Sequence, residues 1–520
     1  MSKRAGIVIL VGAGPGAVDL ITVRGADAIR RADVVIYDYL VSPELLRLAP
    51  AKAALIYAGK KGGSKHDIEQ TELNAMLVAH ARKGRVVVRL KGGDPFIFGR
   101  GGEEAEALVR AQVSFEVVPG VTSAFAGPDF AGIPLTHREH GSFVAFVTGQ
   151  EDAGKTRGSA IPWNELGKAA RAGGTLVILM ASARMRTTLE RLSAAGLAPD
   201  TPCAAVQWAT TAAQKTVTGT LATLAERCAR ERIASPACIV VGECAGLREH
   251  LKWFELTPLF GRTVVVTRAS ATAAKFADAL RRLGADVIEF PTIETVSPRS
   301  YAALDRAIAR LDSFDWMIFT SATGVDSFFA RLKSRGHDVR ELGGASIAAI
   351  GPATAARIGD FALKVAATPD EYRAETIVSA IGPKAIRGKR FLIPRAEVAR
   401  DALPKLLREH GAKEVVVAPC YRTIKPKNAQ VERIRELIAL RKIDLVTFTS
   451  SSTVNNFCEL LGRTASRLKA AAIGPITAET ARQRGFDVVV SPREYTIPAL
   501  TQAIRDYCET ARQAASAGAS

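Results

Sequence analysis

Short runs of β-branched residues alternate with longer helical patterns along most of the chain, and this alternation constrains the fold more than any other feature. The apolar runs at 6–14, 33–38 and 84–91 are typical of buried strands, and each is followed by a helical pattern or a glycine turn. The runs at 174–180 and 237–243 continue the pattern. The sequence therefore predicts α/β architecture with mostly parallel sheets.

One segment interrupts this alternation and predicts a domain boundary. Residues 245–262 place Pro258 and Gly261 in a connector before a new strand begins at 263. A chain of 520 residues is also too long for one core. We expect a first domain at 1–254, a linker at 255–262, a second part at 263–510 and a disordered tail at 511–520.

The second part contains an internal repeat. "DWMIFTSATGVDSFF" (315–329) is echoed by "DLVTFTSSSTVNNFC" (444–458), and "AAIGPATA" (348–355) by "AAIGPITA" (471–478). A repeat of this kind predicts two similar α/β lobes, each with strands that run into helix N-termini. The expected lobes are 292–423, and 263–291 together with 424–510.

Composition excludes several classes of protein. The seven cysteines form no CxxC pair, which argues against a disulfide framework or a zinc site; we expect no metal and a cytoplasmic location. No apolar run reaches the length of a membrane span, and the first residues lack a signal peptide pattern. The net charge of +18 attracts anions, but no nucleic-acid-binding motif accompanies it. A polyanionic small molecule would account for this charge, and so would a generally basic proteome, so the charge alone does not identify a partner.

Three glycine turns follow predicted strands of the first part, at 12–16, 92–94 and 119–123. Open α/β sheets bind small molecules at the carboxyl ends of their strands, where glycine lets the backbone approach a nucleoside. The first turn also fits the G-x-G-x-x-A pattern of a nicotinamide dehydrogenase, with Asp38 placed to hold a ribose. Pro15 lacks the N–H that a pyrophosphate would use there, and the dehydrogenase reading gives the other two turns no role.

The order of motifs in the first part resembles uroporphyrinogen-III C-methyltransferases. The motifs are "VGAGPG", "YDYLVS", "GKKGG", "RLKGGDPFIFGRGGEE", "VVPGVTSA" and "AGIPLTHRE", which together span about residues 5–254. The resemblance implies a two-domain tetrapyrrole-methylase fold, S-adenosylmethionine as the methyl donor, uroporphyrinogen III as the substrate and a homodimer. The cofactor positions that it implies are Pro15, Gly92, Gly93, Asp94, Ile97, Thr122, Ser123, Met180 and Ala209.

The same resemblance implies roles in catalysis. Asp38 and Lys60 occupy the proton-handling positions, and Arg100 and Glu103 lie where the substrate is held or deprotonated. A base is needed because methylation at a pyrrole carbon leaves a cationic macrocycle that must lose a proton. Tyr39 stands where the family commonly has an arginine, so one carboxylate contact is altered. From the residues alone, Arg100 and Glu103 could equally form an i, i+3 ion pair.

The second part resembles uroporphyrinogen-III synthase over about 259–510. The motifs are "VVVTR", "CYRT" and the two repeated pairs. This resemblance implies closure of hydroxymethylbilane without a cofactor, with Tyr421 assisting the hydroxyl to leave and Thr477 in the second Gly-Pro-x-Thr loop. Hydroxyls and N–H groups at helix N-termini also suit carboxylates, although N-capping explains them equally well. On these grounds the further expected substrate contacts are Arg268, Ser321, Arg395, Ser450 and Ser451.

The two resemblances together predict a bifunctional enzyme. The second half would make uroporphyrinogen III, and the first would methylate it at C2 and C7 to precorrin-2, for sirohaem or cobalamin. Two alternatives remain open from the sequence. The first half could be a nicotinamide-dependent tetrapyrrole dehydrogenase, or the second half could bind tetrapyrroles without catalysis.

Overall fold

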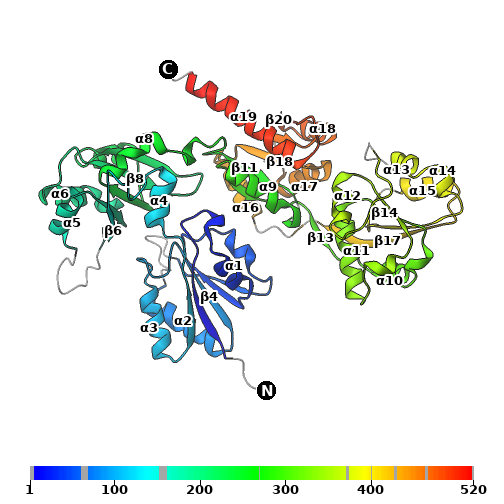
Figure 1. Cartoon of the computed structure of the whole chain (residues 1–520), viewed down its shortest axis with the longest axis horizontal. Coiled ribbons are helices and arrows are strands. Elements are labelled where there is room, and N and C mark those ends of the chain that lie inside the picture. The colour runs from blue at the N-terminus through cyan, green and yellow to red at the C-terminus, as the bar shows by residue number, and fades with distance from the viewer. Residues whose placement is uncertain are drawn as a thin grey trace. The chain divides into compact units, whose positions relative to one another are not determined.

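The computed structural model describes residues 5–59, 68–150, 161–268, 270–369, 374–399, 401–424, 426, 430–462 and 467–517 (Figure 1). The chain divides into two compact units. One comprises 1–264 with 279–287 and 504–520, and the other comprises 265–278 with 288–503. Across the described residues, no helix combines the length and the apolar character that crossing a membrane requires.

The first sheet has the order β3-β2-β4-β1-β5, and every pairing in it is parallel. Its strands are β1 (Ile7–Gly12), β2 (Val34–Tyr37), β3 (Ala54–Tyr57), β4 (Val86–Lys91) and β5 (Ser114–Val118). Leucine and alanine side chains of α2 (Gln70–Arg82) and α3 (Gly101–Arg110) pack on one face, and α1 (Val23–Arg30) packs on the other. Because all five strands are parallel, the turns after β1, β4 and β5 lie at one edge.

The second sheet has the order β6-β7-β10-β8-β9, and only β6 and β7 pair in parallel. Its strands are β6 (Phe143–Thr148), β7 (Gly174–Leu179), β8 (Pro202–Gln207), β9 (Lys215–Thr220) and β10 (Ala237–Val241). The expectation of mostly parallel strands is wrong here. The connection at 208–214 is too short for the crossover that a parallel neighbour needs, so β8 and β9 pair antiparallel.

Two further five-stranded sheets carry the repeated motifs. One contains β13 (Glu294–Val296), β17 (Glu414–Ile424), β16 (Arg390–Ala396), β14 (Trp316–Phe319) and β15 (Ser346–Ala349); the other contains β12 (Asp286–Glu289), β11 (Thr263–Val266), β18 (Leu445–Phe448), β19 (Lys469–Ala472) and β20 (Asp487–Val490). The repeat is visible in the structure, since β14 leads to α11 (Ala322–Ser334) as β18 leads to α17 (Ser451–Leu461). Likewise β15 leads to α12 (Pro352–Gly359), and β19 to α18 (Pro475–Gln483).

The chain ends in a long helix, α19 (Ile497–Ala517), drawn in red in Figure 1. The predicted disordered tail is therefore wrong for residues 511–517, and 518–520 lie outside the described residues. Arg512 donates hydrogen bonds to the carbonyl oxygens of Leu256 (2.7 Å) and Thr257 (3.3 Å). These contacts and the high helix propensity of the alanines stabilise the last turns.

Candidate active site

The three glycine turns of the first sheet are in direct backbone contact. Gly14 and Gly93 exchange two hydrogen bonds, of 3.2 and 2.7 Å between nitrogen and carbonyl oxygen. A Cβ on Gly120 would lie 2.3 Å from the carbonyl oxygen of Gly93 and 2.6 Å from the Cα of Gly12. Only glycine allows so close an approach. The turns after β1, β4 and β5 thus form one continuous backbone surface.

Asp94 holds two of these turns together. Its Oδ1 accepts hydrogen bonds from the backbone N–H groups of Phe96 (2.8 Å) and Ile97 (3.1 Å). Its Oδ2 accepts one from the N–H of Gly120, at 3.0 Å. The carboxylate of Asp94, which was expected at the cofactor site, therefore joins the turn after β4 to the turn after β5.

The second sheet contributes the opposite wall. β7 and β8 both run antiparallel to β10, so the residues that follow them, Met180 and Ala209, lie at the same edge of this sheet. The backbone N–H of Ala17 donates to Thr210 Oγ1 at 3.0 Å, which joins the turn after β1 to the turn after β8. The sequence analysis did not identify Thr210.

Helix α4 (Ser123–Ala131) connects the two walls. It begins beside the glycine turns, where the hydroxyl of its N-cap Thr122 accepts from the N–H of Ala124 at 3.3 Å. Its alanines then pack against Val177 and Ala204 of the second sheet. The structure thus places Pro15, Gly92–Asp94 and Thr122–Ser123 on one wall, and Met180 and Ala209 on the other.

Backbone conformations that side chains rarely adopt gather around these turns. Positive φ angles occur at Phe98 (53°), Arg100 (60°), Met180 (57°), Trp208 (48°) and Thr210 (67°). Each costs about 1–2 kcal/mol, and such strain concentrates at ligand sites. Apolar side chains are also exposed here, including Ile97 and Met180, which leave 42% and 44% of their surface to solvent. These features fit a ligand-binding cradle.

Arg100 and Glu103 form the ion pair that their spacing allowed. Two guanidinium nitrogens of Arg100 contact the two carboxylate oxygens of Glu103 at 2.9 and 2.8 Å, and both side chains are about half exposed. The pair lies at the start of α3 and remains accessible to an anionic ligand. Lys60 lies outside the described residues.

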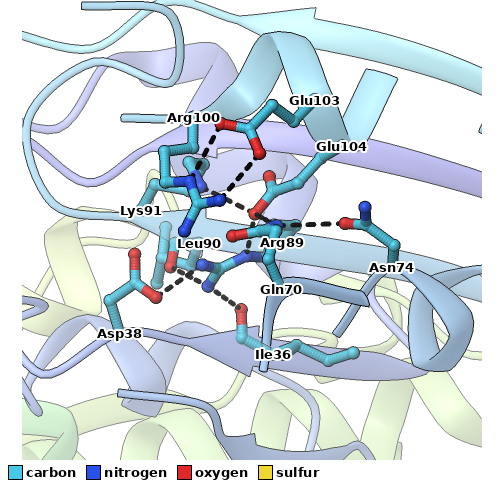
Figure 2. Close-up of polar contacts among 10 residues, drawn as sticks. All are labelled: Ile36, Asp38, Gln70, Asn74, Arg89, Leu90, Lys91, Arg100, Glu103 and Glu104. Atoms are coloured by element: carbon cyan, nitrogen blue, oxygen red, sulfur yellow. Dashed lines mark hydrogen bonds and ion pairs between the residues drawn. The ribbon is translucent and has the colours of Figure 1, made fainter. Parts of the chain in front are cut away.

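Asp38 belongs to a buried charge network that the sequence analysis missed (Figure 2). Arg89 Nη2 contacts Asp38 Oδ1 at 2.5 Å, and Arg89 Nε donates to Glu104 Oε1 at 3.0 Å. Lys91 Nζ contacts the same Glu104 oxygen at 2.8 Å. A signal was present in the sequence, since two cations at i, i+2 share one face of an otherwise apolar strand.

Burial changes the protonation of this network. Burial, and then the neighbouring charge of Arg89, lowers the pKa of Lys91 below its ordinary value. Burial alone would lower the pKa of Arg89 as well, but the carboxylates of Asp38 and Glu104 together raise it. The guanidinium of Arg89 is therefore a permanent charge between the two carboxylates.

His137, Glu139 and His140 also approach one another, with possible ligand atoms within 4.8 Å. The hairpin that carries them is closed by two backbone hydrogen bonds between His137 and Gly141, of 2.8 and 3.0 Å. The Nδ1 of His137 accepts from the N–H of Glu139 at 3.2 Å. That nitrogen is thus already used within the hairpin.

In the second half, the structure brings Ser321 and Tyr421 together. Their hydroxyl oxygens lie 3.1 Å apart, and Ser321 also caps α11 by accepting from the N–H of Gly324 at 3.0 Å. Burial raises the pKa of Tyr421, so its phenol is neutral at physiological pH. A pocket of about 330 Å³ lies beside it and is lined by Tyr301, Arg331 and Cys420, among others.

The other residues of this half that were expected to contact the substrate are buried or already interact with neighbouring protein groups. Ser450 caps α17 in a capping box with Thr453, so N-capping accounts for its hydroxyl. Ser451 receives a hydrogen bond from Thr480 at 2.8 Å, and Thr477 is buried in the first turn of α18. Burial lowers the pKa of Arg268, and Arg395 Nη2 contacts Asp401 Oδ1 at 2.5 Å.

Comparisons with known proteins match the two halves of the chain to two different families. The family model of tetrapyrrole (corrin/porphyrin) methylases matches residues 8–225, and that of uroporphyrinogen-III synthase HemD matches 274–502. The chain is 36% identical over 489 residues to the porphyrin biosynthesis protein HemD of Ruminiclostridium josui. That match covers 94% of this chain and 95% of the relative.

Two further relatives are named as methyltransferases, and each is more similar to the part of this chain that it matches. The chain is 47% identical over 251 residues to the S-adenosyl-L-methionine-dependent uroporphyrinogen III methyltransferase of Methanosarcina barkeri, which covers 48% of this chain and 96% of the relative. It is 39% identical over 342 residues to the uroporphyrinogen-III C-methyltransferase of Bacillus subtilis, and this match covers 66% of this chain and 69% of the relative. Both resemblances are confirmed, and the matches favour a methylase over a dehydrogenase. The chain therefore belongs to the family of bifunctional tetrapyrrole-biosynthesis enzymes in which a uroporphyrinogen-III C-methyltransferase half precedes a uroporphyrinogen-III synthase (HemD) half.

Proposed function

We propose that the second half closes hydroxymethylbilane to uroporphyrinogen III and that the first half methylates this product at C2 and C7 to precorrin-2. S-Adenosylmethionine is the methyl donor, and the product enters the sirohaem or cobalamin branch. The observation that carries the first assignment is the meeting of three glycine turns opposite Met180 and Ala209. The relatives that share 95% and 96% of their length with this chain support both assignments by name.

The residues of the cradle fit S-adenosylmethionine. A Cβ on Gly93 would have only Thr122 Cα and Ser123 N nearby, at 3.8 and 3.9 Å, so open space lies beside this turn. The exposed side chains of Ile97 and Met180 offer apolar walls to a nucleoside. When bound, the sulfonium supplies an activated methyl group, so the chain itself needs to orient the substrate and to remove a proton.

The first half carries charges suited to those tasks. Arg100 keeps half its side chain exposed, and its guanidinium can bind a carboxylate of the substrate in bidentate geometry. Asp38 is the proposed proton acceptor, since 28% of its side chain is exposed at the carboxyl end of β2. Glu103 and Lys60 are the further proposed proton-handling groups. The net charge of +18 attracts both polycarboxylate substrates.

In the second half, Tyr421 is the proposed hydrogen-bond donor to the departing hydroxyl. Its neutral phenol, held by Ser321, can donate to that oxygen. The N-termini of α17 and α18, with Ser450, Ser451 and Thr477, are proposed to bind carboxylates of the linear substrate. Arg268 and Arg395 are proposed to add positive charge.

We also propose that the enzyme is a cytoplasmic homodimer that assembles through its first half. The seven cysteines all lie in the described part of the chain and none of them is in a disulfide there, as a reducing compartment allows. Strand β6 is at the edge of its sheet and exposes Phe143 and Phe146, which a partner could cover. Light scattering of the full chain, alone and with both phenylalanines replaced by serine, tests the dimer.

One reaction tests both halves. The purified chain is incubated with fresh hydroxymethylbilane and S-adenosylmethionine, and the mass and isomer type of the tetrapyrrole are recorded. A dimethylated type III product supports both assignments. Unmethylated type III product contradicts the methyltransferase assignment. Type I product alone, which forms spontaneously, would mean that the second half binds without catalysing.

A further inference from the structure

The buried charge network has one end that reaches solvent. The side chains of Arg89, Lys91 and Glu104 are 3%, 3% and 0% exposed, whereas that of Asp38 is 28% exposed. Arg89 and Lys91 lie on the face of β4 that α2 and α3 cover, and Glu104 comes from the first turns of α3. The network therefore connects the interior of the first sheet to the carboxylate beside the glycine turns.

Arg89 cannot turn independently of its neighbours, because its three guanidinium nitrogens all have partners. Nε donates to Glu104, and Nη2 donates to Asp38. Nη1 donates to the backbone oxygens of Leu90 (3.3 Å) and Ile36 (3.5 Å). Figure 2 shows the guanidinium lying between the two carboxylates. Glu104 thus fixes the plane in which Arg89 meets Asp38.

The donors converge on a single oxygen of Glu104. Arg89 and Lys91 both contact Oε1, and Gln70 Nε2 approaches the same atom at 3.5 Å. The other oxygen, Oε2, is buried and has no hydrogen-bond partner among the described residues. Two cations against one buried anion leave an excess positive charge behind Asp38. A buried ion network contributes little net stability compared with apolar packing, so stability alone does not explain it.

We infer that Glu104 and Lys91 are positioning residues for the methyltransferase half, acting through Arg89 to orient Asp38 and to set the charge that faces its carboxylate. The inference rests on the proposed role of Asp38 as proton acceptor. Glu104 holds the Arg89 guanidinium toward Asp38, and Lys91 balances the negative charge of Glu104. The other charged groups at the start of α3 are Arg100 and Glu103, which neutralise each other.

The test uses two single substitutions in the full chain that change the network charge in opposite directions. Glu104→Gln removes a negative charge and leaves Asp38 facing more positive charge. The acidic limb of the kcat/KM profile for methylation then moves to lower pH. Lys91→Met removes a positive charge, and the limb moves to higher pH. Each shift is on the order of one pH unit for a neighbouring unit charge at an effective dielectric constant of about 20.

A second readout does not depend on catalysis. A water-soluble carbodiimide modifies protonated carboxyl groups, so the pH at which Asp38 becomes labelled, read by peptide mass spectrometry, moves in the same two directions. If the wild-type chain does not methylate, the proposed function fails while the labelling still decides this inference. In the double variant, Glu104→Gln with Lys91→Met, the acidic limb of the kcat/KM profile and the pH midpoint of Asp38 labelling both return to their wild-type values.

Glu106→Gln is the matched control, because Glu106 lies on the same helix and its ion pair with Arg110, at 3.5 Å, is exposed to solvent. Neither readout moves in this variant. Circular dichroism and binding of S-adenosylhomocysteine identify variants that fail to fold. If Glu104→Gln does not fold, Lys91→Met and the double variant carry the test. Folded variants whose limb and labelling midpoint both stay at the wild-type pH overturn the inference.

Discussion

Gly93→Ala separates the folding role of the glycine turns from their proposed binding role. Gly93 has φ +69°, a left-handed conformation that costs an alanine about 1–2 kcal/mol. The lower entropy of the unfolded chain offsets about 0.4–1 kcal/mol of this cost. The new Cβ meets nothing closer than Thr122 Cα at 3.8 Å, so no clash is added. We expect a loss of about 1 kcal/mol in the free energy of unfolding and an intact fold.

Binding of the cofactor is expected to be weakened at least as much as the fold in this variant. The methyl group fills the space where the proposed nucleoside lies against Thr122 and Ser123. Overpacking of this kind costs about 1–3 kcal/mol, so S-adenosylhomocysteine should bind on the order of 10- to 100-fold more weakly by calorimetry. An unchanged dissociation constant in the folded variant would refute the assignment of this turn to the cofactor.

Two other glycines are the controls. Gly102 lies in α3, and a Cβ there would meet no atom within 4 Å, so Gly102→Ala should bind normally and be at least as stable as the wild type. Gly120→Ala places a Cβ 2.3 Å from the carbonyl oxygen of Gly93, which the backbone cannot accommodate without moving. We expect this variant to lose both stability and binding.

Three further predictions concern other parts of the chain. Tyr421→Phe removes the hydroxyl contact with Ser321, costs about 1 kcal/mol of stability and lowers the yield of type III product at least tenfold; an unchanged yield would favour a non-catalytic second half. Burial raises the pKa of Cys238 to about 12, so at pH 8 iodoacetamide should modify the half-buried Cys458 first, and equal labelling rates would contradict this order. Arg512→Ala removes the hydrogen bonds to the linker carbonyls and should speed proteolysis near 252–260, whereas an unchanged cleavage rate would show that these bonds do not protect the linker.

Much of the fold could be predicted because the sequence pattern is local. Each predicted strand needs only a short apolar run, and the repeated Thr-Ser and Gly-Pro-x-Thr segments mark the same strand-to-helix junctions in both lobes. The direction of a strand relative to its neighbour cannot be predicted from such a local pattern, because it depends on the path of the chain between the two strands. The run at 202–207 has the same composition whether its neighbour is parallel or antiparallel, and only the short connection at 208–214 decides.

The site divides in a similar way. Gly93, Asp94 and Arg100 lie in an unusual loop, and glycines and charges in a loop indicate contact with a ligand. Arg89 and Lys91 lie just before that loop, at the end of a strand, where alternating charges are typical of a solvent-facing side. In this fold α2 and α3 cover the face of β4 that carries Arg89 and Lys91. Glu104 of α3 contacts both cations there. The groups proposed to contact a ligand could therefore be predicted from the sequence, whereas the buried charges beside Asp38 depend on which face of β4 the helices cover.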